Sequence, residues 1–100
     1  MDIKNRIDNL LNENNTVLFM KGSPEAPMCG FSARATAILA ELQVPFHSVD
    51  VLQDEEIRQG IKDYGNWPTI PQLYHKKELI GGSDIMMEMF ETGELKSLFA

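Results

Sequence analysis

The sequence predicts an α/β fold, a single domain over residues 1–100 with a four-stranded mixed sheet and helices on both faces. Two observations support this prediction. Apolar runs of strand length alternate with segments of helical periodicity through the first two thirds of the chain. Two more short strands then follow at hairpin spacing, before a last helical run. A strand–helix–strand unit followed by a hairpin gives a sheet that contains both parallel and antiparallel strands.

The opening segment predicts an amphipathic helix followed by a buried strand. Its apolar residues recur at three- and four-residue spacing, namely Ile3, Ile7, Leu10 and Leu11. We expect this helix to fray in the asparagine-rich stretch 12–15. Residues 17–20 are a continuous apolar run, which is typical of a buried strand.

The loop after this strand contains the only cysteine of the chain, Cys29. Gly22 and two prolines break the strand, and the alanine-rich run 32–42 predicts a helix that begins near Phe31. Cys29 therefore stands at a strand-to-helix turn. Ser32 occupies the place where a C-x-x-C motif carries its second thiol. We expect no internal disulfide, so a bonding partner of Cys29 has to come from outside the chain.

The second half of the chain predicts, in order, a strand over 46–51, a helix over 54–64, short strands over 72–74 and 78–80, and a helix over 84–91. The helix over 54–64 has acids in its first turn, where they complement the helix dipole. His75 falls in the turn between the two short strands. A Gly-Gly pair ends the second of these strands, and Ser83 is expected to cap the last helix, which runs to Gly93.

Composition and charge disfavour several classes of function. Fifteen acidic against nine basic residues give a net charge of -6, which disfavours sequence-independent binding to nucleic acid or to an anionic membrane. The mixed-charge N-terminus and the lack of a long apolar stretch predict neither a signal peptide nor a membrane span. A lone cysteine indicates a reducing compartment, so we expect a cytoplasmic soluble domain.

Three motifs, in order along the chain, give the most specific signal. The pattern K-G-x-P-x-x-P-x-C-G-F-S covers residues 21–32, W-P-T-I-P-Q-L covers 67–73, and G-G-S-D covers 81–84. Together with the strand and helix order, these motifs closely resemble the monothiol, CGFS-type glutaredoxins, and the layout is that of the thioredoxin fold. The resemblance extends over essentially the whole chain. Ser83 is a departure, because many members of that family carry a second cysteine there.

The resemblance implies glutathione, an extended tripeptide with two carboxylates, an ammonium group and a central thiol, as the ligand. Lys21 and Arg58 supply two cations that can hold the glycyl carboxylate. The N–H groups around Gly82 and Ser83, at a helix start, can hold the γ-glutamyl carboxylate. Asp84 can then pair with the ammonium group.

A second part of the implied ligand site lies in the middle motif. Thr69, Ile70 and Pro71 resemble the cis-proline turn of thioredoxin-like proteins, in which the backbone before the proline pairs with an extended ligand. Ile70 is thus expected to act through its main chain. For Trp67, a packed loop residue and a residue that borders the site are equally compatible with the sequence.

Cys29 is expected to be a reactive thiolate. The free N–H groups and the dipole of a helix N-terminus favour the anion, and nearby Lys21 adds to that, so we expect the pKa of Cys29 to lie below the free value of ~8.5. A buried, inert cysteine is the alternative, but the surrounding Pro27 and Gly30 in a loop disfavour it.

Two functions use such a thiolate together with glutathione. A 2Fe-2S cluster needs four ligands, and a homodimer supplies two Cys29 thiolates while two glutathiones supply the other two. The alternative is a glutathione-dependent thiol–disulfide oxidoreductase acting through Cys29. The missing second thiol favours the cluster carrier. The resemblance also implies BolA-like partners and apo iron–sulfur proteins as recipients. A cysteine hydrolase is disfavoured, because neither His47 nor His75 is expected near Cys29.

Overall fold

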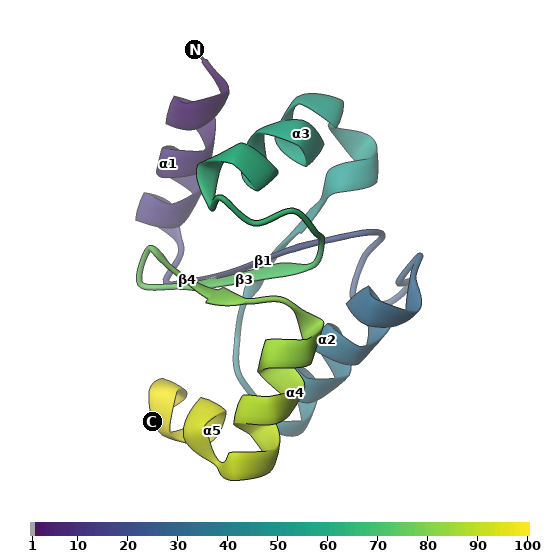
Figure 1. Ribbon diagram of the computed structural model, residues 1–100, viewed down its shortest axis with the longest axis vertical. Coiled ribbons are helices and arrows are strands. Elements are labelled where there is room, and N and C mark those ends of the chain that lie inside the picture. Colours follow the sequence, from purple (N-terminus) through teal and green to yellow (C-terminus); the bar gives the residue numbers. More distant parts are fainter. Residues whose placement is uncertain (1) are drawn as a thin grey trace.

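The computed structural model describes residues 2–100 and confirms the predicted α/β thioredoxin fold (Figure 1). Its sheet has four strands in the order β2-β1-β3-β4. The central β1 (Thr16–Met20) pairs in parallel with β2 (His47–Asp50) and antiparallel with β3 (Gln72–His75). The edge strand β4 (Glu78–Gly81) pairs antiparallel with β3. The parallel pair and the hairpin thus form the mixed sheet that the sequence predicts.

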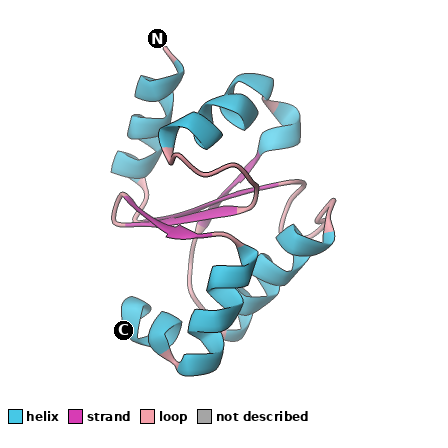
Figure 2. Cartoon of the chain, viewed as in Figure 1, coloured by secondary structure: helices cyan, strands magenta, loops and turns pink. Residues whose placement is uncertain are grey.

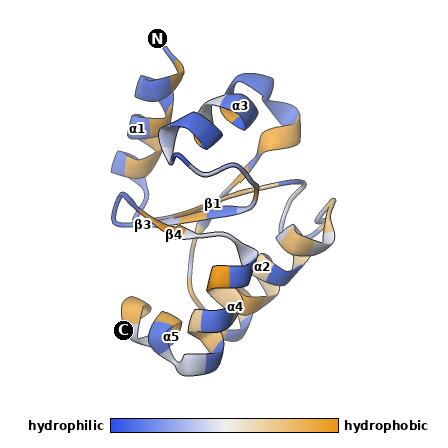
Figure 3. Ribbon diagram, in the orientation of Figure 1, coloured by the Kyte–Doolittle hydropathy of each residue, from blue (hydrophilic) through white to orange (hydrophobic). Residues whose placement is uncertain are grey.

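Helices cover both faces of this sheet (Figure 2). On one face lie α1 (Ile3–Glu13) and α3 (Glu55–Tyr64). On the other face lie α2 (Gly30–Glu41), α4 (Ser83–Thr92) and the short α5 (Glu94–Phe99). Figure 3 shows that hydrophilic residues predominate along α1 and α3. The buried residues of the two helices are apolar, as expected for helices that pack one face against a sheet: Ile7, Leu11, Ile57 and Ile61.

The core consists of two apolar clusters, one on each side of the sheet. Successive side chains of β1 alternate between them, because neighbouring residues of a strand point to opposite faces. Val17 and Phe19 pack with α1 and α3, while Leu18 and Met20 pack with α2, α4 and α5. All four are completely buried, so β1 is the rigid element from which the cysteine loop departs.

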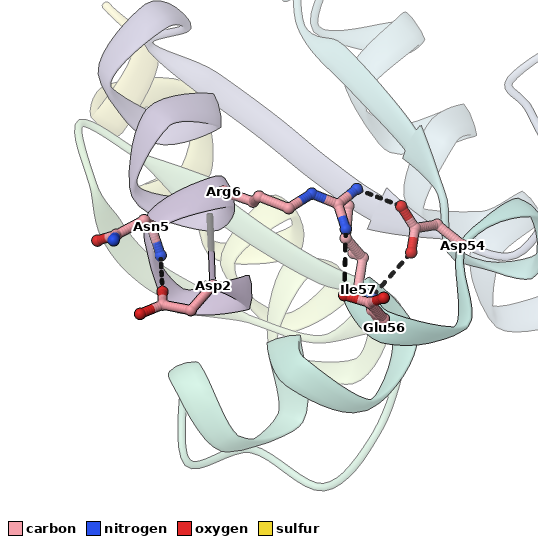
Figure 4. A network of polar contacts seen from close by, with 6 residues as sticks. All are labelled: Asp2, Asn5, Arg6, Asp54, Glu56 and Ile57. Atoms are coloured by element: carbon pink, nitrogen blue, oxygen red, sulfur yellow. Dashed lines mark hydrogen bonds and ion pairs between the residues drawn. The ribbon is translucent and has the colours of Figure 1, made fainter.

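A polar network ties α1 to the start of α3 (Figure 4). Asp54 caps α3, since its Oδ1 accepts a hydrogen bond of 3.2 Å from the Ile57 N–H. Arg6 of α1 donates to the other carboxylate oxygen of Asp54 and lies 3.6 Å from Glu56. The hydrogen bond from Arg6 holds the pKa of Asp54 below its usual value. This contact fixes α3, which carries part of the ligand cavity described below.

The C-terminal third departs from the sequence prediction at three points. Ser83 is the first residue of α4 and not its cap; Gly82 occupies the cap position without any side-chain cap bond. His75 ends β3, and the turn consists of Lys76 and Lys77, both at positive φ. The third is α5, a helix that the sequence pattern did not predict. Gly93 adopts φ 88°, a left-handed conformation that ends α4 and redirects the chain.

Smaller differences concern element ends. α2 begins at Gly30, one residue after Cys29, and a 3₁₀ turn over Val51–Gln53 follows β2 in place of its last predicted residue. Along residues 2–100, every helix is too short or too polar to span a lipid bilayer.

Candidate functional site

Cys29 is the N-cap residue of α2, with its sulfur directed at the first turn of that helix. The Ser32 N–H donates to Sγ over 3.3 Å, and the Ser32 hydroxyl lies 3.4 Å from the same sulfur. The Lys21 N–H donates to Ser32 Oγ over 3.0 Å. In this bond the Ser32 oxygen is the acceptor, so the hydrogen of the hydroxyl remains available to donate to the Cys29 thiolate.

This arrangement favours the anionic form of Cys29. Burial alone raises the pKa of the thiol, but the hydrogen bonds from the Ser32 hydroxyl and from the N–H groups of Ser32 and Phe31 act against it. The charge of Lys21 acts in the same direction as these bonds, and together they hold the pKa of Cys29 below its ordinary value. The direction agrees with the expectation from the sequence.

The loop before Cys29 is fastened to the end of the sheet. The Gly22 N–H donates to Asp50 Oδ1 over 2.9 Å, and the Met28 N–H donates to the Lys21 carbonyl over 2.8 Å. Gly22 has φ 89°, and a Cβ at this position would lie 2.5 Å from the Ala26 carbonyl oxygen. A larger residue would therefore displace the backbone of the loop that presents Cys29.

A cavity of about 390 Å³ lies next to this loop, between the N-terminus of α4, the end of α3 and the segment before β3. Its lining comprises Lys21, Phe31, Lys62, Trp67, Pro68, Thr69, Ile70, Gly82, Ser83, Asp84 and Ile85. Six of the residues predicted as ligand-binding thus lie around one space: Lys21, Thr69, Ile70, Gly82, Ser83 and Asp84. Pro71 does not line the cavity, but its bond to Ile70 is cis, as the resemblance implies.

Lys62, which is not among the residues predicted from the sequence, contributes the second cation of the cavity wall. Arg58 is not among the lining residues; its guanidinium lies 3.7 Å from Glu55, and its buried Nε has no partner within residues 2–100. Lys62 follows Arg58 by one helical turn on α3 and so shares its side of the helix. That spacing is a signal from which the sequence alone can suggest Lys62.

One end of the cavity gathers hydrogen-bond donors that lack acceptors. The N-terminus of α4 has no side-chain cap, which leaves N–H groups of its first turn unpaired. Within residues 2–100, the buried Ser83 Oγ and Trp67 Nε1 also have no partner. Gly82 keeps this end open, because a Cβ there would lie 3.2 Å from the Pro71 carbonyl oxygen and 3.4 Å from Trp67 Nε1. Such an end suits a carboxylate.

Asp84 lies on the rim of the cavity and is 87% exposed. Its carboxylate lies 3.5 Å from the guanidinium of Arg34, which in turn sits 5.9 Å from the ring centre of Phe31. An ammonium group bound to Asp84 therefore meets a competing cation.

Both histidines lie at the other end of β1 from Cys29. His47 is in register with Val17 on β1, and His75 is in register with Thr16. A hydrogen bond of 2.9 Å joins Nδ1 of His75 to the hydroxyl of Thr16. Neither histidine lines the cavity. This agrees with the expectation that neither histidine lies in a segment near Cys29. Across the described range 2–100, no three His, Cys, Asp or Glu side chains are grouped closely enough to hold a metal ion.

The family model described as Glutaredoxin matches residues 16–80. The chain is 53% identical, over 97% of its length and 91% of the other protein, to "Uncharacterized monothiol glutaredoxin ycf64-like" of Synechocystis sp.. It is 54% identical to Monothiol glutaredoxin-S17 of Arabidopsis thaliana over 95% of its own length, but it spans only 20% of that longer relative.

Solved structures share the fold. The solution structure of reduced poplar apo GrxS14 superposes with a TM-score of 0.84 at 45% identity, covering 96% of this chain and 88% of the other. A buckwheat glutaredoxin–glutathione complex gives a TM-score of 0.84 at 22% identity, covering 96% and 86% of the two chains.

Proposed function

Because the chain belongs to the glutaredoxin family, and within it to the monothiol glutaredoxins, we propose that it binds glutathione beside Cys29 and carries a 2Fe-2S cluster between two copies. The observation that carries the proposal is the cavity of about 390 Å³ that adjoins the Cys29 loop and combines two lysines with unpaired donors. The cluster is cargo in this proposal, and glutathione is the molecule that completes its ligand set.

Glutathione matches the charges around the cavity. Lys21 and Lys62 offer two cations to the glycyl carboxylate, and the uncapped start of α4 with the Ser83 hydroxyl offers donors to the γ-glutamyl carboxylate. Asp84 on the rim offers a negative charge to the ammonium group. Arg58 joins this set if its guanidinium leaves Glu55. The buckwheat glutaredoxin was solved with glutathione, which supports the choice of ligand for this fold.

A cluster bridged by two chains follows from the thiolate count. The chain has one cysteine, so two copies supply two thiolates and two bound glutathiones supply the remaining two. Cys29 is partly exposed and is flanked by two apolar side chains that face solvent, Met28 at 67% and Phe31 at 57% exposure. Exposed apolar side chains around the thiolate suit a face that a second copy covers.

A second candidate is disulfide exchange, which the stabilised thiolate of Cys29 favours. The thiolate attacks the glutathione sulfur of a mixed disulfide, forms a Cys29–glutathione disulfide and releases the substrate thiolate. A second glutathione thiolate then attacks the bound glutathione sulfur, which gives glutathione disulfide and restores the Cys29 thiolate. Ser32 cannot replace this second glutathione, because it carries no thiol.

Partners and location follow as parts of the same proposal. Apo iron–sulfur proteins receive the cluster, and BolA-like proteins replace one copy at the exposed face around Cys29. The net charge of -6 disfavours nucleic acid and anionic membranes as partners. The cytoplasm provides the reduced glutathione that the site requires.

Anaerobic reconstitution with iron, sulfide and glutathione tests the proposal, followed by size-exclusion chromatography with visible absorption. We expect cluster absorption in a dimer peak, no cluster when glutathione is omitted, and no cluster in Cys29→Ser, because a hydroxyl is a poor ligand for iron. Rapid glutathione-dependent disulfide reduction by a wild-type protein that takes up no cluster would make the second candidate the primary function.

A further inference from the structure

Gln72, the first residue of β3, is an amide side chain completely buried beneath the cavity wall. Its Nε2 donates to the carbonyl of Trp67 over 3.1 Å and to the carbonyl of Thr69 over 3.2 Å. Its Oε1 accepts a 3.2 Å hydrogen bond from the Tyr74 hydroxyl. Both amide hydrogens and the amide oxygen are therefore used, which holds the side chain in one orientation.

These bonds fix the direction of one peptide group in the wall. The Thr69–Ile70 peptide is trans, since the cis bond of this segment is the next one, Ile70–Pro71. In a planar trans peptide the C=O and N–H point in opposite directions. With the Thr69 carbonyl turned inward to Gln72, the Ile70 N–H points away from Gln72.

The Ile70 N–H is on the side where a ligand can use it. The Ile70 side chain is buried in the core and only 7% exposed, yet the residue lines the cavity. Within residues 2–100 this N–H donates no hydrogen bond. A donor without a partner at a cavity wall is ready for an acceptor on an incoming molecule.

We propose that Gln72 is a positioning residue, whose amide turns the Thr69 carbonyl inward and thereby aims the Ile70 N–H at a main-chain carbonyl of the bound peptide. This inference rests on the proposed binding of glutathione, whose cysteinyl carbonyl is the acceptor. Gln72 itself contacts no ligand. It acts through the direction of one peptide group, and the same amide holds Trp67 in the wall.

The test combines calorimetric titration of glutathione with amide hydrogen exchange at Ile70, measured by NMR with and without glutathione. In the wild type we expect saturating glutathione to slow exchange at Ile70 by about tenfold or more, as befits a newly formed hydrogen bond. Gln72→Met keeps the length of the side chain but donates nothing. We expect it to bind glutathione about tenfold more weakly and to lose the protection at Ile70.

Two further variants distinguish orientation of the Ile70 N–H by Gln72 from a general effect of Gln72 on packing. Tyr74→Phe removes the bond to Gln72 Oε1 and leaves both Nε2 bonds, so it should keep glutathione affinity and Ile70 protection close to the wild type. Gln72→Asn keeps the amide but draws it back by one carbon, and an intermediate loss is expected. This milder variant carries the test if Gln72→Met does not fold.

The outcomes are distinct. If the wild type binds glutathione but Ile70 gains no protection, or if both Gln72 variants bind and protect like the wild type, the role of Gln72 is overturned. If the wild type binds no glutathione at all, the proposed function itself fails.

Discussion

Replacing Lys62 by alanine removes one of two cations that face the ligand cavity from separate elements. Lys62 lies on α3 and Lys21 follows β1, and both line the same space. The chain as a whole carries a charge of -6, so these lysines provide the local positive charge that an anionic ligand needs. Glutathione has two carboxylates and one ammonium group, and loss of Lys62 leaves its glycyl carboxylate with Lys21 alone.

The size of the effect follows from the kind of contact. A charge-assisted hydrogen bond contributes about 1.5–3 kcal/mol, so Lys62→Ala should weaken glutathione binding roughly 10- to 150-fold. The lower part of this range is expected, because Lys62 is only half-buried and solvent screens part of its charge. For the same reason the difference from wild type should shrink as salt rises from about 0.1 M to about 1 M.

Calorimetric titration at pH 7 measures this difference directly. The matched control is Lys96→Ala, which removes the same charge from α5, outside the lining of the cavity. We expect the control to bind glutathione as the wild type does. Binding by Lys62→Ala within about twofold of the wild type, where a lost contact predicts at least tenfold, would refute the assignment of Lys62 to the ligand.

Three further predictions concern the cysteine loop. Burial opposes the thiolate of Cys29, but the hydrogen bonds and Lys21 outweigh it, so alkylation by iodoacetamide should reach half its maximal rate at lower pH than for free cysteine. Ser32→Ala should move that midpoint upward. Because folding lowers the pKa of Cys29, ionisation of this thiol stabilises the folded state. The stabilisation is complete above pH ~8.5, the pKa of the thiol in the unfolded chain, and is lost as the pH falls through the folded-state pKa. Gly22→Ala should lower the free energy of unfolding, measured by urea denaturation, by more than about 1 kcal/mol. Gly30→Ala should leave it nearly unchanged, because a Cβ on Gly30 meets no atom within 4 Å. Equal losses in the two variants would contradict the role of Gly22. Oxidised Ser32→Cys should titrate with no free thiol, since the two side chains already approach to 3.4 Å, and it should reconstitute less cluster; two free thiols after oxidation would refute this.

The sequence predicted the parts of the fold that depend on local pattern. The strand, loop and helix around Cys29 follow from an apolar run, a glycine with two prolines, and an alanine-rich segment, each of which acts on its own stretch of chain. α5 was missed because it has only six residues and directly follows α4, so no loop composition separates the two helices. Ser83 has the right chemistry for a cap, but the extended backbone of the cap residue falls on Gly82.

The candidate site likewise contains residues that could be predicted from the sequence and residues that could not. The motifs located Lys21, Thr69 and Asp84, because their resemblance to the monothiol glutaredoxins implies that these residues bind one ligand. Arg58 and Lys62 lie on the same side of α3, one turn apart, so which of them reaches the cavity depends on where along α3 the cavity lies, and tertiary packing sets this. The unpaired donors of Trp67 and Ser83 become visible only in the folded chain, where both side-chain atoms are buried, and the role of Gln72 only through the bonds of its amide to the carbonyls of Trp67 and Thr69.

We propose that two Cys29 thiolates and two glutathiones hold one cluster between two chains. Native mass spectrometry of the anaerobically reconstituted protein can test this arrangement, because it measures the mass of the intact assembly. We expect a species with the mass of two chains, one 2Fe-2S cluster and two glutathiones, and we expect Lys62→Ala to lower its yield while Lys96→Ala does not. A cluster bound by a single chain, or by two chains without glutathione, would rule out this ligand set.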